Sequence, residues 1–251
     1  MSKGNIVEWS EKPWNPITGC DPLSKGCENC YAKKIAAWCH RMGQSKYQNG
    51  FNLTLHSEAL LEPYKRKKPT RILCCSMSDL FHKDIPLEYI QQVFQVICDN
   101  PQHLFMIVTK RAEILNKYHS QLPWPDNVLQ AVSVEHSRYK YRLKLLQETN
   151  AKKKVAFFEP LLGNLGDLDL SGIDWAFVGG ESGPGARTME KEWVLSIKEK
   201  CDEQGCTFIF KQWAGNQREN RGCLLDGKRY DNIPSIEILN KIGSLGILKP
   251  G

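Results

Sequence analysis

Six short apolar runs between residues 71 and 210 limit most strongly the folds open to this chain. They are rich in β-branched and aromatic residues, which is typical of strands buried on both faces. The runs cover residues 71–77, 103–109, 129–134, 155–158, 174–178 and 207–210. Helical patterns occupy three of the intervals, at residues 86–99, 137–149 and 189–204, the last ending at a glycine that suits a helix C-cap.

Strands that alternate with helices form parallel units joined by right-handed crossovers. We therefore expect a partial or full (β/α) barrel, with an open doubly wound sheet as the alternative. A short additional strand is predicted near residues 6–9. The length of 251 residues suits one large α/β domain, which we place at residues 1–234, followed by a tail at residues 235–251.

Three cysteines, Cys20, Cys27 and Cys30, stand close together ahead of the first apolar run with the spacing C-x6-C-x2-C. A structural zinc site normally has four protein ligands. Three thiolates on one loop instead favour a [4Fe-4S] cluster with one iron open to a non-protein ligand. The alternative is a zinc site completed by Cys39 or His40, although a helix predicted to begin near Cys30 would carry Cys39 away from the loop.

Polar residues follow all six apolar runs. In parallel α/β folds the carboxyl ends of the strands gather at one edge, where ligands bind. The residues are Ser76, Ser78 and Asp79; Thr109, Lys110 and Arg111; Ser133 and Glu135; Glu159; Gly179, Gly180 and Glu181; and Lys211. We expect these residues to form a functional rim.

Two members of this rim allow a closer prediction. Glu159 follows an apolar strand, where a buried carboxylate needs a partner, so a ligand amine or a basic rim residue is expected beside it. Gly179 and Gly180 lack the spacing of a dinucleotide-binding helix. They would let a nucleoside or the methionine end of a cofactor approach the backbone, or would serve as a plain turn.

Charge and hydropathy restrict the partners. The start of the chain has no apolar stretch of signal length and no segment resembles a membrane span, so we expect a cytoplasmic protein. Its ten cysteines are then expected to be reduced. The net charge of +6 includes basic runs at residues 65–68 and 152–154, which are compatible with a nucleotide or nucleic-acid partner but are more often solvated faces.

Several of these motifs together resemble the phage-encoded three-cysteine-motif proteins, a family of unknown function that is similar to radical S-adenosylmethionine enzymes. The resemblance spans residues 8–234. It rests on WNPITGC at 14–20, GCENCY at 26–31, SMSDLFH at 76–82, TKR at 109–111, EPLL at 159–162, VGGESG at 178–183 and KQW at 211–213. The cysteine spacing departs from the C-x3-C-x2-C of most radical enzymes.

The resemblance implies a radical enzyme that holds a [4Fe-4S] cluster and S-adenosylmethionine, receives electrons from a flavodoxin or ferredoxin, and forms a 5′-deoxyadenosyl radical. The resemblance does not specify the substrate, and a nucleotide or nucleic acid is compatible with the basic runs. We predict Cys20, Cys27 and Cys30 as metal ligands and Lys110, Glu159 and Lys211 as catalytic residues. The predicted cofactor-binding residues are Ser76, Ser78, Asp79, Ser133, Glu135, Gly179, Gly180 and Glu181. The alternatives are a zinc-stabilised nucleic-acid-binding protein and a phage–host interaction protein without catalysis.

Overall fold

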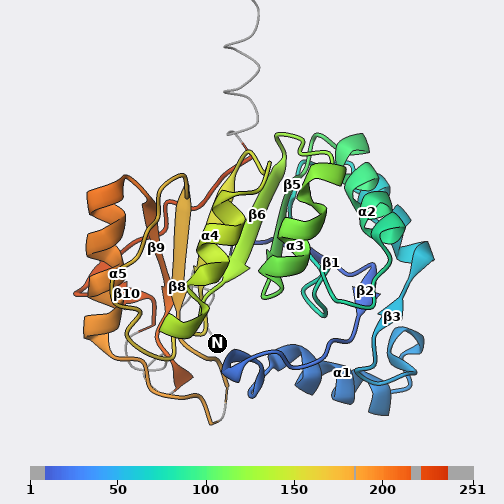
Figure 1. Cartoon of the computed structure of the whole chain (residues 1–251). Helices are drawn as coiled ribbons and strands as arrows, with labels where there is room; N and C mark the ends of the chain where they lie inside the picture. The colour runs from blue at the N-terminus through green and yellow to red at the C-terminus, as the bar shows by residue number, and fades with distance from the viewer. Residues whose placement is uncertain (1–8, 184, 216–221, 237–251) are drawn as a thin grey trace, which may run out of the picture.

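Seven parallel strands form a curled half-barrel with helices between them (Figure 1). The computed structural model describes residues 9–183, 185–215 and 222–236. The sheet order is β1-β4-β5-β6-β7-β8-β9, so each strand pairs with its neighbours in the chain. The strands are β1 (Lys12–Trp14), β4 (Arg71–Cys74), β5 (Leu104–Thr109), β6 (Val128–Ser133), β7 (Lys154–Phe158), β8 (Trp175–Gly179) and β9 (Thr207–Gln212). The expected partial barrel is thereby confirmed.

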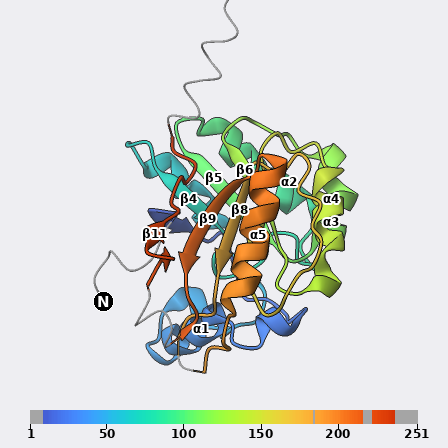
Figure 2. The same ribbon diagram turned by 90° about the vertical axis from the view of Figure 1, so that its left-hand side faces the viewer.

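Helices cover the convex face of the sheet, as both views show (Figures 1 and 2). They are α2 (Leu87–Asp99), α3 (Ala112–Tyr118), α4 (Tyr141–Gln147) and α5 (Lys191–Gln204). A further helix, α1 (Tyr31–Arg41), lies beside the carboxyl ends of the strands. Helix α5 ends as predicted at Gly205, whose φ of 70° is left-handed. Between β7 and β8 the described chain crosses over without a helix.

Alternate residues of each strand point to the two faces and build two separate cores. In β5, Phe105 and Ile107 pack outward under the helices, whereas Leu104 and Met106 join the core on the concave face. On that concave face the rings of Phe157 and Phe177 stack, with their centroids 4.7 Å apart. Burial on both faces explains why the strands read as continuous apolar runs.

The first strand lies elsewhere than predicted. The prediction placed a strand near residues 6–9, of which residues 6–8 lie outside the described part and Trp9 is in no strand. The observed strand is β1, in which Lys12 and Pro13 are exposed and Trp14 is buried. Because only one of its three residues is buried, no apolar run marks it in the sequence.

The smaller elements are two antiparallel pairs. β2 (Ile17–Thr18) pairs with β3 (Thr54–Leu55), and β10 (Leu224–Leu225) pairs with β11 (Lys228–Arg229). Within the described residues no helix is both long and apolar enough to cross a bilayer. Most of the predicted tail, from residue 237 onward, lies outside the described residues.

Candidate functional site

A cavity of about 650 Å³ lies at the carboxyl ends of the strands. Cys20, Cys27 and Cys30 all line it. The predicted rim residues that line it are Ser76, Ser78, Asp79, Thr109, Lys110, Arg111, Ser133, Glu159, Gly180, Glu181 and Lys211. Its apolar wall includes Met106, Val108 and Phe157 from the concave face of the sheet. The cysteine loop and the strand ends, which are distant in the sequence, therefore enclose one space.

The cysteine loop comes after β1 and the short strand β2, between β2 and α1. Gly19 begins it, and its N–H donates to the carbonyl of Met77 at 3.0 Å. A single 3₁₀ turn, Lys25–Cys27, then leads to Cys30, the N-cap of α1. This confirms the helix predicted to begin near Cys30.

Gly19 is a position that only glycine can occupy. Its φ is +83°, and an added Cβ would lie 2.2 Å from the carbonyl oxygen of Asn52. We expect Gly19→Ala to cost about 1–3 kcal/mol of stability through backbone strain alone, with the clash adding to it. Gly43→Ala is the matched control, because Gly43 has a φ of +70° but open space around its Cβ position. Equal losses in urea unfolding would contradict a role for the contact with Asn52.

Asp79 and Arg111 hold the first cysteine. The Asp79 carboxylate accepts hydrogen bonds from Thr109 Oγ1 at 2.7 Å and from the Lys110 N–H at 3.1 Å. The guanidinium of Arg111, which is 7% exposed, donates to the Asp21 carbonyl at 3.1 Å and lies 3.8 Å from Cys20 Sγ. Burial, followed by the charge of Asp79, raises the pKa of the Cys20 thiol to about 11, and Arg111 opposes this shift.

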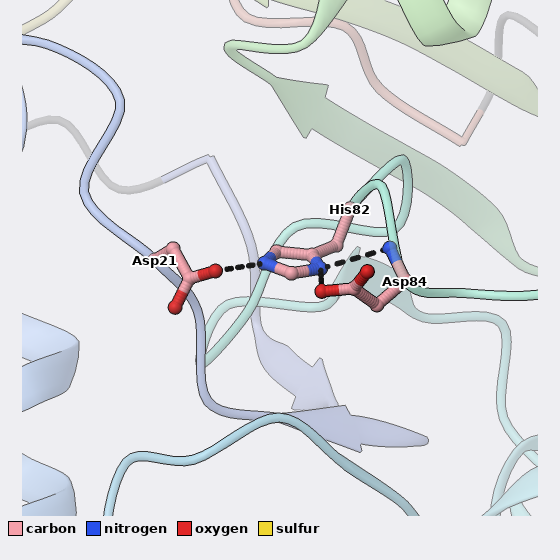
Figure 3. Close-up of side chains that lie close together, drawn as sticks. All are labelled: Asp21, His82 and Asp84. Atoms are coloured by element: carbon pink, nitrogen blue, oxygen red, sulfur yellow. Dashed lines mark hydrogen bonds and ion pairs between the residues drawn. The ribbon is translucent and has the colours of Figure 1, made fainter.

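His82 ties the next residue, Asp21, to the end of β4 (Figure 3). Its Nδ1 accepts a hydrogen bond from the Asp84 N–H at 3.3 Å, so Nε2 carries the proton and donates to Asp21 Oδ2 at 3.2 Å. Burial and the nearby Arg111 lower the pKa of His82, which favours this neutral form. The neutral ring thus holds the side chain of Asp21, the residue next to Cys20.

Arg187 clamps the far side of the loop to the end of β8. It forms an ion pair with Glu181 and donates to Glu28 Oε2 and to the Lys25 carbonyl, both at 2.9 Å. Asn29 Nδ2 also donates to Glu181 Oε2, at 3.0 Å. Burial alone would raise the pKa of Glu181, but these hydrogen bonds bring it below its usual range. Glu181 therefore holds the loop.

Two predicted cofactor-binding residues do not line the cavity. Glu135 is fully buried below the loop, where its carboxylate pairs with Arg142 Nη1 at 3.0 Å, and a Cβ at Gly26 would lie 3.1 Å from its side chain. Gly179 packs closely against Gln212 and Glu159, where a Cβ would lie 3.1 Å from Gln212 Nε2. Both residues support the site from behind.

Glu159 has the basic partner that the sequence predicted. Its carboxylate accepts hydrogen bonds from Lys211 Nζ at 2.5 Å and from Gln212 Nε2 at 2.7 Å, and both donors come from the end of β9. Lys211 Nζ also lies 5.8 Å from the centre of the Phe157 ring. Lys110 lines the same cavity, and its ammonium group has no partner among the described residues. The described lining of the cavity thus includes the ion pairs Glu159–Lys211 and Asp79–Arg111 and, at Lys110, a cation without a described partner.

The three thiols are not gathered as the ligands of one closed zinc site. Sulfur ligands of one tetrahedral zinc lie about 3.8 Å apart. Among the described residues, only Asp21, His82 and Asp84 bring three ligand atoms within 4.8 Å of one another. In a cubane cluster each thiolate binds a separate iron, so its sulfurs are held farther apart.

The proposed fourth zinc ligands also point elsewhere. Cys39 is buried with Ala32 and Ala36 on the inner face of α1. His40 Nδ1 donates to the Tyr47 carbonyl at 2.9 Å. Neither joins the loop cysteines in a compact ligand set among the described residues. Cys20, Cys27 and Cys30 remain partly exposed free thiols.

The sequence from residue 4 to residue 234 matches a protein family described as "Protein of unknown function (DUF5131)". The chain belongs to this family. No curated protein matches it. The phage origin expected from the sequence remains a prediction.

Solved structures with a similar course of the chain include two of spore photoproduct lyase. One is a mutant with bound AdoMet and dinucleoside spore photoproduct. Its sequence is 13% identical, the TM-score is 0.46, and the match covers 81% of this chain and 66% of that chain. The other is complexed with dinucleoside spore photoproduct, with 14% identity, a TM-score of 0.43 and the same coverage. This chain thus spans just under two thirds of their length. At such identities the likeness concerns the fold alone.

Sequence reasoning missed the residues that fix the loop from a distance. Arg187 and Arg142 lie outside the motifs, and no local pattern marks either one. Arg111 and His82 do lie within quoted motifs, but nothing in the sequence indicates that they hold Asp21. Arg111 was predicted as a rim residue, but its hydrogen bond to the Asp21 carbonyl was not.

Proposed function

We propose that this protein is a radical S-adenosylmethionine-type enzyme whose cluster is held by Cys20, Cys27 and Cys30. One observation carries the proposal: three free thiols on the loop after β1 line the same cavity as polar residues from the carboxyl ends of the other strands. Cluster and cosubstrate must lie side by side in such an enzyme. A cavity of about 650 Å³ has the volume of a typical small-molecule site.

The [4Fe-4S] cluster, when bound, would supply the electron that cleaves the carbon–sulfur bond of S-adenosylmethionine. The chain itself supplies position and charge. Arg111 and His82 fix the segment that carries Cys20, and Arg187 fixes the turn that carries Cys27. Lys110 offers a cation for a carboxylate or phosphate. Gly180 also lines the cavity, and its missing side chain leaves room for Ala214, which packs against it.

The substrate is proposed to be a small molecule or a single nucleotide unit that enters this cavity. The two basic runs that suggested nucleic acid lie at the opposite edge of the sheet, directly before β4 and β7. Lys152 and Lys153 are held there by Asp126, and Arg66 Nη2 donates to the Pro13 carbonyl at 2.9 Å. These runs therefore give no support to a nucleic-acid track that leads to the cavity.

The test is anaerobic purification with iron and sulfide counted per chain, followed by electron paramagnetic resonance with and without S-adenosylmethionine. We expect about four irons per chain and a spectrum that S-adenosylmethionine perturbs. Dithionite reduction in its presence should release 5′-deoxyadenosine. A protein that binds zinc in place of iron, or a cluster whose spectrum ignores S-adenosylmethionine, would overturn the proposal.

A further inference from the structure

Helix α1 has two apolar faces, and the described residues of the chain cover only one of them. Ala32, Ala36 and Cys39 face inward and pack near Tyr47 and Met77. The second face consists of Tyr31, Ile35, Trp38 and Met42, which are 49%, 43%, 52% and 63% exposed. At 100° per residue these four side chains fall within a sector of about 60°. We call them the α1 stripe.

The stripe is unusual for this protein. The other large apolar side chains exposed among the described residues are scattered along the chain: Leu23, Leu55, Leu61, Tyr64, Tyr141, Leu195 and Leu224. Scattered exposed residues are normal on a protein surface. A contiguous row that includes tryptophan and methionine is typical of a protein–protein interface.

The charge around the stripe is positive. Helical geometry places Lys34 and Arg41 along the edge that faces away from the protein, and α1 also carries Lys33. The helix contains no acidic residue. A partner that covers the stripe would therefore complement it with an acidic rim around an apolar centre.

The stripe begins at the cysteine loop. Cys30 is the N-cap of α1, and Tyr31, the first residue of the stripe, lines the cavity together with the three cysteines. Trp38 lies about 10 Å farther along the helix axis. Both views place α1 beside the carboxyl ends of the strands (Figures 1 and 2). A protein docked on the stripe would lie next to the loop.

We propose that the α1 stripe is the docking surface for a small acidic one-electron carrier protein. This inference rests on the proposed function, since a cluster on the loop needs an electron from outside. In the step the carrier is oxidised by one electron and the cluster is reduced by one, with no bond formed or broken. The aliphatic and thioether side chains of Ile35 and Met42 favour a protein over a nucleic acid, because they offer nothing to phosphates.

Stopped-flow reduction of the reconstituted protein tests the proposal, with reduced flavodoxin and with dithionite as separate donors. The variants are W38A with M42S, which removes apolar contact, and K34E with R41E, which reverses charge. All four side chains are exposed, so the fold should survive. We expect each pair to slow reduction by flavodoxin at least about tenfold, as is typical when central interface residues or steering charges are lost. Reduction by dithionite and the iron content should stay unchanged.

Leu195→Ala with Lys152→Glu is the matched control, because it removes an exposed leucine and reverses an exposed lysine elsewhere. It should leave both rates unchanged. Normal reduction of the stripe variants by flavodoxin would overturn the docking proposal while the cluster function stands. A dimer or a nucleic-acid complex lost in the same variants, with the flavodoxin rate intact, would also overturn it. A wild-type protein that assembles no cluster would instead refute the proposed function.

Discussion

Alanine at Cys20, Cys27 or Cys30 is expected to abolish assembly of the iron–sulfur cluster. Anaerobic reconstitution of wild-type protein should give about four irons per chain, and each single variant should retain well under half of that number. The physical reason is that each thiolate binds its own iron, and metal ligation is what removes the proton from a thiol such as Cys20. Iron and sulfide analysis, together with the visible absorption of the brown protein, measures the loss.

Two other cysteines serve as controls for this experiment. Cys98 is partly exposed on α2, away from the cavity lining, so Cys98→Ala should keep full iron. Cys39→Ala tests the alternative fourth ligand and should also keep full iron, because Cys39 packs inside α1. Full iron in all three loop variants would show that the loop does not hold the cluster.

Removal of Arg142 is expected to destabilise the protein by about 3–5 kcal/mol, the usual cost of leaving one member of a buried ion pair alone. The side chains of Arg142 and Glu135 are both 0% exposed. Arg142 also donates to the Ser133 carbonyl at 2.8 Å and stacks on the Tyr139 ring at 4.3 Å. In Arg142→Met the Glu135 carboxylate would stay buried without its cation. Urea unfolding of the apoprotein measures the change.

The double variant Glu135→Gln with Arg142→Met separates charge from packing, because it leaves no unpaired charge. It should recover part of the loss. Lys152→Ala breaks an exposed pair with Asp126 and should cost less than about 1 kcal/mol. If Arg142→Met lowers the free energy of unfolding as little as Lys152→Ala does, the buried ion pair does not stabilise the protein as predicted. Because the Glu135 side chain lies close to Gly26 in the cysteine loop, Arg142→Met should also lower the iron content.

Much of the fold was predictable because a strand that is buried on both faces has a continuous apolar run in the sequence. β5 and β6 are almost fully buried, and both were predicted within a residue or so of their observed limits. β1 was misplaced, because it is short and exposes Lys12 and Pro13. Strand detection by apolar runs fails for a short strand with mostly exposed side chains, whereas the other edge strand, β9, is buried enough to be detected.

The sequence predicted which residues belong to the candidate site, but only partly how they lie relative to one another. The three cysteines and most rim residues line one cavity, and the expected basic partner of Glu159 is Lys211. The sequence did not indicate which rim residues face a ligand. Glu181 and Glu135 each bind an arginine, so they support the site.

The sequence by itself determined the strand–helix alternation, the cysteine spacing and the presence of polar residues after the strands. These are local properties, because they depend on the hydrophobic periodicity and on the order of residues that are neighbours in the sequence. Only the tertiary structure decided that Arg187 meets Lys25 and Glu28, about 160 residues away in the chain. It also decided that one apolar face of α1 is left exposed by the described residues. Such contacts depend on how the half-barrel curls, and the summed packing of all strands sets that curvature.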